Sequence, residues 1–239
     1  MNIYETKEIA DIVRGNSYVG RGIVLGKTQN GKKAAVAYFI MGRSNNSRNR
    51  VFAERNGEVF TEPFDASKVE DPSLIIYAAL RRYKNNLIVT NGNQTDTIYE
   101  GFEKGLTFSE SLKSREFEPD APNFTPRISG VVYLGGEDFD YEMSILKSAD
   151  EFGTACNRFT FSYKALNGVG HFIHTYVCDG NPIPTFQGEP ERCKIPDDID
   201  EFTSSLWNAL DENNKISLYV RYVDIKTGAE ENRMINKNK

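Results

Sequence analysis

Three arginines gather in the stretch MGRSNNSRNR, residues 41–50, where they alternate with serines and asparagines. Arg43, Arg48 and Arg50 have no acidic neighbour there, although the whole chain carries a net charge of -5. A guanidinium offers a planar pair of N–H donors to a phosphate or carboxylate, and Ser44 adds a neutral donor. This composition is typical of a small-anion site and, equally, of a solvated hairpin loop.

Two other polar stretches lie beside predicted strands. NSYVGRG, residues 16–22, sets Arg21 between glycines, which indicates either a close approach by a ligand or a strand bulge. TNGNQTD, residues 90–96, places Asn91 and Asn93 ahead of a predicted helix. Amides at such a position read a carboxamide or a base edge, or they cap the helix.

A fourth stretch, PNFTPRISG at residues 122–130, contains Asn123, Thr125 and Arg127 between prolines. It belongs to a long loop without periodicity, and such loops in compact domains are more often functional or disordered than incidental. The four stretches together predict a pocket for a small anionic ligand. They do not by themselves specify a reaction.

Several kinds of chemistry lack their sequence signatures. The two histidines, His171 and His174, are three apart in a strand-like run and should face opposite ways, which makes a metal site or a Ser-His-Asp triad improbable. Three cysteines, Cys156, Cys178 and Cys193, show no CxxC spacing. Phosphate-binding P-loop and dinucleotide fingerprints are also missing. We therefore expect no metal and no cofactor.

Composition narrows the class of protein further. The 239 residues are 39% hydrophobic and 26% charged, as in ordinary globular proteins. The acidic balance argues against nucleic-acid binding, which requires a basic face. The longest apolar run is too short to span a membrane, and the first residues lack the basic-then-apolar pattern of a signal peptide, so we expect a cytoplasmic protein.

Local patterns predict an α+β fold with antiparallel sheets in one domain, residues 1–239. Asn30-Gly31 and Asn56-Gly57 indicate two hairpins. Helices are predicted over 71–83, with Asp71 as N-cap and Pro72 next; over 95–105, capped by Thr95 or Asp96; and over 197–212. Further strands are predicted in the runs NLIVT, ISGVVYLG, YEMSILKS, RFTFSYKAL, GHFIHTYVCD and ISLYVRYVDI.

Residues 18–50 resemble the start of the archaeal-type IMP cyclohydrolase family, and the likeness extends to later motifs in the same order. The matching residues are Tyr18, Gly20, Arg21, Gly26-Lys27-Thr28, Gly42-Arg43-Ser44, Asn49-Arg50, Asn91, Gly92, Asp96, Asn123, Thr125, Pro126, Arg127 and Gly188-Glu189-Pro190. The chain is longer than the archaeal enzymes and is similar to the longer bacterial form.

This resemblance implies a four-layer αββα sandwich similar to the N-terminal nucleophile hydrolases. It also implies the closure of 5-formamidoimidazole-4-carboxamide ribotide to IMP with loss of water, in purine biosynthesis. The partner would be a purine nucleotide, and association into a homo-oligomer is compatible with the family. N-terminal nucleophile chemistry is not expected, since the sequence starts Met1-Asn2.

The resemblance suggests roles for individual residues. The phosphate would be held by Arg21, Arg43 and Arg127 with Ser44 assisting, and Thr125 would also bind substrate. Carboxamide and imidazole would be read by Asn91, Asn93 and Asn123, whereas Tyr18, Arg50 and Glu189 would move protons or stabilise an oxyanion. Two alternatives stay open: a nucleotide-binding relative without this activity, and an amidohydrolase of N-terminal-nucleophile-like fold acting on another substrate.

Overall fold

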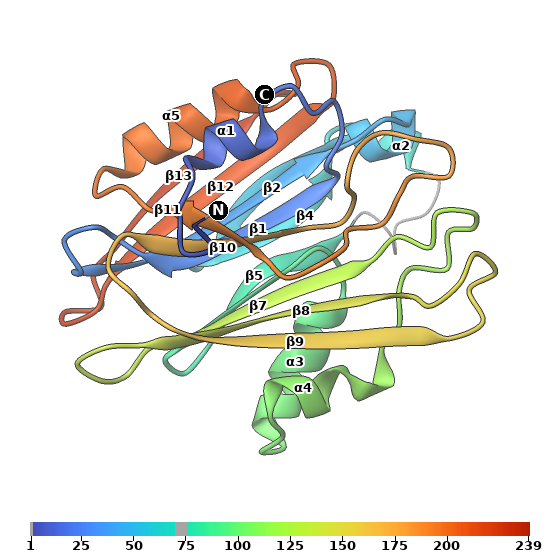
Figure 1. The fold of residues 1–239 in the computed structure, drawn as a ribbon. Helices are drawn as coiled ribbons and strands as arrows, with labels where there is room; N and C mark the ends of the chain where they lie inside the picture. Colours follow the sequence, from blue (N-terminus) through green and yellow to red (C-terminus); the bar gives the residue numbers. More distant parts are fainter. Residues whose placement is uncertain (1, 70–75) are drawn as a thin grey trace.

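The computed structural model describes residues 2–69 and 76–239, and within these ranges two antiparallel sheets form the centre of the protein (Figure 1). The first sheet has six strands in the order β11 (Glu191–Lys194), β10 (Val169–His174), β1 (Arg21–Lys27), β2 (Lys33–Met41), β12 (Lys215–Asp224) and β13 (Glu230–Asn236). The second has seven in the order β3 (Arg50–Arg55), β4 (Glu58–Pro63), β5 (Tyr77–Tyr83), β6 (Asn86–Thr90), β7 (Arg127–Tyr133), β8 (Asp140–Ser148) and β9 (Cys156–Lys164).

The two predicted hairpins are confirmed. Asn56 and Gly57 both have positive φ, 54° and 77°, as the tight turn between β3 and β4 requires. Gly31 has a φ of 73° in the turn between β1 and β2. The α+β class and the antiparallel pairing are confirmed as well.

Helices cover the outer faces of both sheets. They are α1 (Ile9–Val13), α3 (Gln94–Glu103), α4 (Phe108–Ser111) and α5 (Ile199–Ala209). The single turn α2 (Asn45–Arg48) lies in the connection between β2 and β3, and short 3₁₀ turns are at Ala66–Lys68 and Leu112–Ser114. Figure 1 shows α1 and α5 over the first sheet and α3 and α4 beneath the second. Accordingly, Phe202 and Leu206 pack on the first sheet, and Ile98 and Phe108 pack on the second.

A third apolar core fills the space between the sheets. It takes alternate residues of each strand, such as Ile23 and Leu25 of β1 and Met143 and Ile145 of β8. A polar side chain in step with these residues at a strand end therefore enters the same inter-sheet gap. In the described part of the chain, no helix combines the length and hydropathy needed to cross a membrane.

The structure corrects one element and adds others. The helix predicted over 71–83 is wrong in the part that the structure describes, because Tyr77–Tyr83 is strand β5. Asp71 and Pro72, the predicted start of that helix, lie outside the described residues. The helix expected from Thr95 or Asp96 begins one or two residues earlier, at Gln94, after Asn93 as N-cap. Strands β11 and β13 and the short helices α1, α2 and α4 were not predicted.

Candidate functional site

Arg21 enters the inter-sheet gap from the first residue of β1. It is in step with Ile23, a member of the inter-sheet core. Its backbone N–H donates to Thr175 Oγ1 at 3.1 Å. The preceding Gly20 has a φ of 77°, and a Cβ there would lie 2.1 Å from the same Thr175 oxygen, so only glycine allows this close approach.

Arg50 enters the gap from the opposite sheet, and Glu118 joins it from a loop. Arg50 is the first residue of β3 and is in step with Phe52, another inter-sheet core residue. Glu118 is buried, and its Oε2 lies 3.8 Å from Arg21 Nη2. The loop is fixed locally because the Glu118 N–H donates to the carbonyl oxygen of Thr125 at 2.9 Å.

Both arginines carry buried N–H donors for which the described part of the chain supplies no acceptor. Only 7% of Arg21 and 3% of Arg50 is exposed. Arg21 Nε and the Nε and Nη1 of Arg50 have no hydrogen-bond partner among the described residues. An unmet buried donor on a charged group costs at least about 1–3 kcal/mol, so this arrangement favours the arrival of an acceptor. We call Arg21, Arg50, Arg127 and Glu118 the arginine cluster.

Burial and neighbouring charges shift the protonation equilibria of the arginine cluster. Burial lowers the pKa of Arg50, and the nearby Arg21 lowers it further. For Arg21 burial also acts to lower the pKa, but Glu118 and the surrounding tyrosines raise it above its ordinary value. Burial raises the pKa of Glu118, with Arg21 and Arg127 opposing that shift. The carboxyl is therefore a better proton acceptor than an ordinary glutamate.

A pair of tyrosines lies beside the arginine cluster. The hydroxyls of Tyr38, on β2, and Tyr77, on β5, are 2.8 Å apart and bridge the two sheets. Burial first, and then Tyr77, raises the pKa of Tyr38 well above its ordinary value. Tyr38 therefore keeps its proton at neutral pH and can donate it in a hydrogen bond.

Arg127, the first residue of β7, completes the arginine cluster next to helix α3. Its Nη1 donates to Gln94 Oε1 at 2.9 Å, and burial lowers its pKa. Gly92 lies against this pair, because a Cβ there would be 2.5 Å from Arg127 Nη1 and 3.6 Å from Glu118 Oε1. Asn91 joins β6 to β7: its Nδ2 donates to Pro126 O and its Oδ1 accepts from the Ile128 N–H, both at 2.9 Å.

Arg43 and Ser44 form their contacts with residues outside the arginine cluster. Arg43 Nη1 is paired with the carboxylate of Asp179 and donates to Gly180 O at 2.8 Å. Its guanidinium lies 5.2 Å from the centre of the Tyr18 ring. Figure 1 shows the loop between β10 and β11, which contains Asp179, running beside α2. Ser44 Oγ caps α2 by accepting from the Ser47 N–H.

Four predicted site residues remain, and only one of them, Thr125, directly borders the arginine cluster; the others are Asn93, Asn123 and Glu189. Asn93 Oδ1 accepts from Arg115 at 3.4 Å, and Asn123 Oδ1 accepts from the Ile183 N–H at 3.1 Å. Thr125 Oγ1 is 2.5 Å from the Tyr176 hydroxyl, and both border the cluster. Glu189 is exposed and acts instead on Tyr163, whose pKa is raised by burial and then by this carboxylate.

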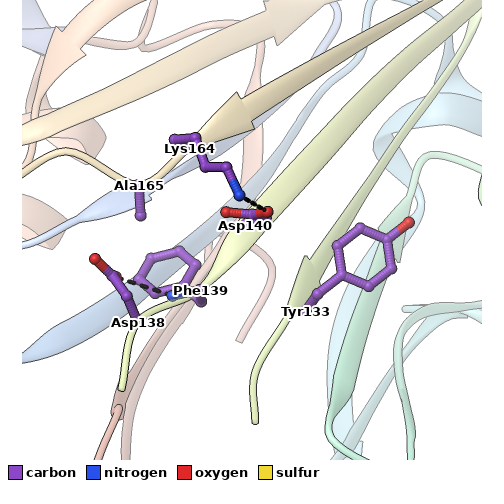
Figure 2. Close-up of a pocket in the computed structure, with 6 residues that line it drawn as sticks. All are labelled: Tyr133, Asp138, Phe139, Asp140, Lys164 and Ala165. Carbon is purple, nitrogen blue, oxygen red and sulfur yellow. Dashed lines mark hydrogen bonds and ion pairs between the residues drawn. The ribbon is translucent and has the colours of Figure 1, made fainter. Parts of the chain in front are cut away.

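A separate surface cavity of about 370 Å³ lies at the other end of the second sheet (Figure 2). Its lining includes Tyr133, Asp138 and Asp140. Lys164 Nζ is already paired with Asp140 at 2.6 Å, and Asp138 with Lys27 at 2.9 Å. The seven residues of β7 span about 20 Å between Arg127 and Tyr133, so this cavity is remote from the arginine cluster.

Sequence patterns did not identify Glu118, Tyr38, Tyr77 and Gln94. Tyr38 and Tyr77 look like core residues of strands, and Glu118 is one acid among several in an aperiodic loop. Its position between Phe117 and Pro119 is the one signal that could have singled it out. In the described ranges, no group of three or more His, Cys, Asp or Glu residues is arranged to hold a metal ion.

Comparison with known proteins identifies the family of this chain. The family model described as IMP cyclohydrolase-like protein matches residues 18–228. The IMP cyclohydrolase of Methanococcus aeolicus is 27% identical over 203 residues, which is 77% of this chain and 90% of that protein. The IMP cyclohydrolase of Methanopyrus kandleri is 36% identical over 126 residues, 51% of this chain and 61% of that protein. The chain belongs to the IMP cyclohydrolase-like family.

Proposed function

We propose that this protein is an IMP cyclohydrolase, which closes 5-formamidoimidazole-4-carboxamide ribotide to IMP and releases water. Family membership and the relatives' names support the reaction. The structural observation that carries the proposal is the pair of buried guanidiniums, Arg21 and Arg50, whose N–H donors face one gap and find no acceptor within residues 2–69 and 76–239. Such donors suit a substrate that has carbonyl oxygens and develops negative charge during reaction.

The reaction needs orientation and charge stabilisation more than covalent catalysis. The carboxamide nitrogen attacks the formyl carbon, and the formyl oxygen becomes an oxyanion. That oxygen then leaves as water with one hydrogen from the carboxamide nitrogen and one from the formamide nitrogen. Orientation within a closed site supplies up to about 7–11 kcal/mol in favourable intramolecular cases, and each fixed oxyanion donor about 3–4 kcal/mol.

The geometry supports a division of roles. We propose that Arg21 and Arg50 donate to the developing oxyanion, since their free donors come from opposite sides of the gap. Glu118 would accept the proton from the attacking nitrogen, because burial raises its pKa. Tyr38, which stays protonated, would supply the hydrogen bond that helps the oxygen leave as water.

The residues named from the sequence keep proposed roles of different kinds. Arg127 would hold Glu118 in place, and Asn91 would fix the strand ends around both. Tyr18 and Thr125 would shape the wall of the pocket. The phosphate contacts of Arg43 and Ser44, the substrate contacts of Asn93 and Asn123, and the proton-transfer role of Glu189 stay predictions.

The wider context is proposed on the same basis. The order helix, sheet, sheet, helix supports a likeness to the N-terminal nucleophile hydrolase fold, with residues 1–239 acting as one domain. Action on a phosphorylated intermediate of purine biosynthesis fits a cytoplasmic protein, either alone or as a homo-oligomer.

The test is an assay of purified protein with the formamido ribotide, following IMP formation against a no-enzyme control. The expected result is turnover that falls about 100-fold or more when Glu118 is replaced by glutamine. If IMP raises the melting temperature but no turnover occurs, the protein is a nucleotide-binding relative without this activity. An absence of both effects would leave the family likeness as one of fold only.

A further inference from the structure

Lys147 is a buried cation that the roles above do not use. It lies on β8 in step with Tyr141, Met143 and Ile145 of the inter-sheet core, so its side chain faces the same gap as Arg21. Only 8% of the residue is exposed. The ammonium group donates to Phe186 O at 2.8 Å and to Gln187 Oε1 at 3.1 Å.

Among the described residues this ammonium has no acidic partner. Both of its acceptors are neutral carbonyl oxygens, and no carboxylate in the described ranges lies within ion-pair distance of its Nζ. Its remaining surroundings include the Phe159 ring, whose centre is 5.4 Å from Nζ. Burial alone lowers the pKa of Lys147. A buried cation without a counterion is costly, and an arriving anion would offset that cost.

Lys147 is at the same end of the gap as the arginine cluster. Leu146, its neighbour on β8, is paired in register with Arg127. On the other side, the Phe186 N–H donates to Thr175 O at 3.0 Å, and Thr175 in turn accepts from the Arg21 N–H. A series of hydrogen bonds therefore connects Phe186, which accepts from Lys147, to Arg21 at the start of β1.

We infer that Lys147 binds the 5'-phosphate of the substrate and so selects a nucleoside monophosphate over a nucleoside. Unlike Lys147, the other cations named for the phosphate have an acidic group beside them: Arg43 is paired with Asp179, and the charge of Glu118 acts on both Arg21 and Arg127. Lys147 borders Gln187 and Phe159, which are exposed, whereas Arg50 is deeply buried. The strongly hydrated phosphate would thus sit at the open end and the reacting groups at the closed end.

This inference rests on the proposed function, because it takes the ligand to be a purine ribotide. The experiment compares IMP and inosine by calorimetry in the wild type, Lys147→Met, Lys147→Arg and the control Lys164→Met. Lys164 is on the adjacent strand β9, and its side chain is 83% exposed at the far end of the sheet. Inorganic phosphate is tested in parallel as a stabiliser in thermal unfolding.

The expected result is that Lys147→Met weakens IMP binding about 10- to 100-fold and leaves inosine binding within about two-fold. Lys147→Arg should keep most of the preference for IMP, and Lys164→Met all of it. Phosphate should raise the melting temperature of the wild type and not that of Lys147→Met. Equal losses for IMP and inosine, or an unchanged phosphate effect, would mean that Lys147 only ties the 186–187 segment to β8, and the inference would be overturned.

Together with the IMP-formation assay, these data separate this inference from the proposed function. A preference for IMP that depends on Lys147, in a protein without cyclohydrolase turnover, supports the phosphate site and contradicts the reaction. Turnover with an IMP preference that is independent of Lys147 supports the reaction and contradicts the phosphate site. If neither IMP nor phosphate binds to the wild type, both are wrong.

Discussion

Replacing Arg50 by methionine should stabilise the unliganded protein while removing most of its activity. The Nε and Nη1 of Arg50 are buried without acceptors among the described residues. Burial and Arg21 hold the pKa of Arg50 below its unfolded value, so the charged form lowers the free energy of unfolding at every pH below that value, including neutral pH. Methionine fills a similar unbranched space without the unmet donors.

The size of the effect follows from those two donors. At about 1–3 kcal/mol for each unmet buried donor, and allowing for the cavity left by the shorter side chain, we expect a net gain of about 2 kcal/mol. For a chain of this size that corresponds to a rise in melting temperature of about 4–8 °C. Loss of an oxyanion donor should lower kcat about 100- to 1,000-fold.

The assay combines thermal unfolding without ligand and IMP formation at saturating substrate. Arg55→Met is the matched control, because Arg55 is on the same strand β3 but its side chain is 61% exposed and pairs with Glu62 at the surface. It should change the free energy of unfolding by less than about 0.5 kcal/mol and leave kcat unchanged. A destabilised Arg50→Met protein whose kcat stays within three-fold of wild type would refute the reasoning.

Three further outcomes are expected. Burial holds the pKa of Glu118 above its unfolded value, so the free energy of unfolding of the wild type should fall as pH rises from about 4.5 through the folded pKa. Glu118→Gln should flatten that part of the curve when denaturation is measured as a function of pH. An unchanged slope would contradict the buried position of Glu118. Gly92→Ala should displace Arg127 and lower the free energy of unfolding in urea by about 1–3 kcal/mol. The control Gly136→Ala should lower it little, because a Cβ there would lie 3.4 Å from its nearest neighbouring atom. Equal effects of the two substitutions would argue against the close contact at Gly92. Tyr38→Phe should lower kcat about ten-fold or more and stability by about 0.5–1.5 kcal/mol, and full activity would exclude its hydroxyl from the reaction.

The local signals in the sequence were strong enough to predict most of the sheets. Asn56-Gly57 determines a turn through the positive φ that these residues tolerate, whatever surrounds it. The helix predicted over 197–212 is also confirmed, since α5 spans Ile199–Ala209 and buries Ile199, Phe202 and Leu206. Tyr77–Tyr83 was mistaken for a helix because alanine and leucine are good helix formers; pairing with β4 and β6 overrides that preference.

The candidate site was only partly accessible to sequence reasoning. Arg21, Arg50 and Arg127 stood out as members of polar stretches, but that they start strands and lie near one another depends on two sheets packed face to face. Glu118 could not be recognised as their common partner, because burial and not residue type distinguishes it from other loop acids. Nothing in the sequence distinguishes Lys147 from a surface lysine at the end of a strand, because its burial and its contact with Phe186 arise only in the folded protein.

The measurement that tests the central claim most directly is a crystal structure of this protein with IMP bound. We predict that IMP lies between the two sheets, with an oxygen of its base within hydrogen-bonding distance of Arg21 or Arg50. IMP bound at the cavity lined by Tyr133, Asp140 and Lys164 instead, with the arginine cluster unchanged, would contradict the account.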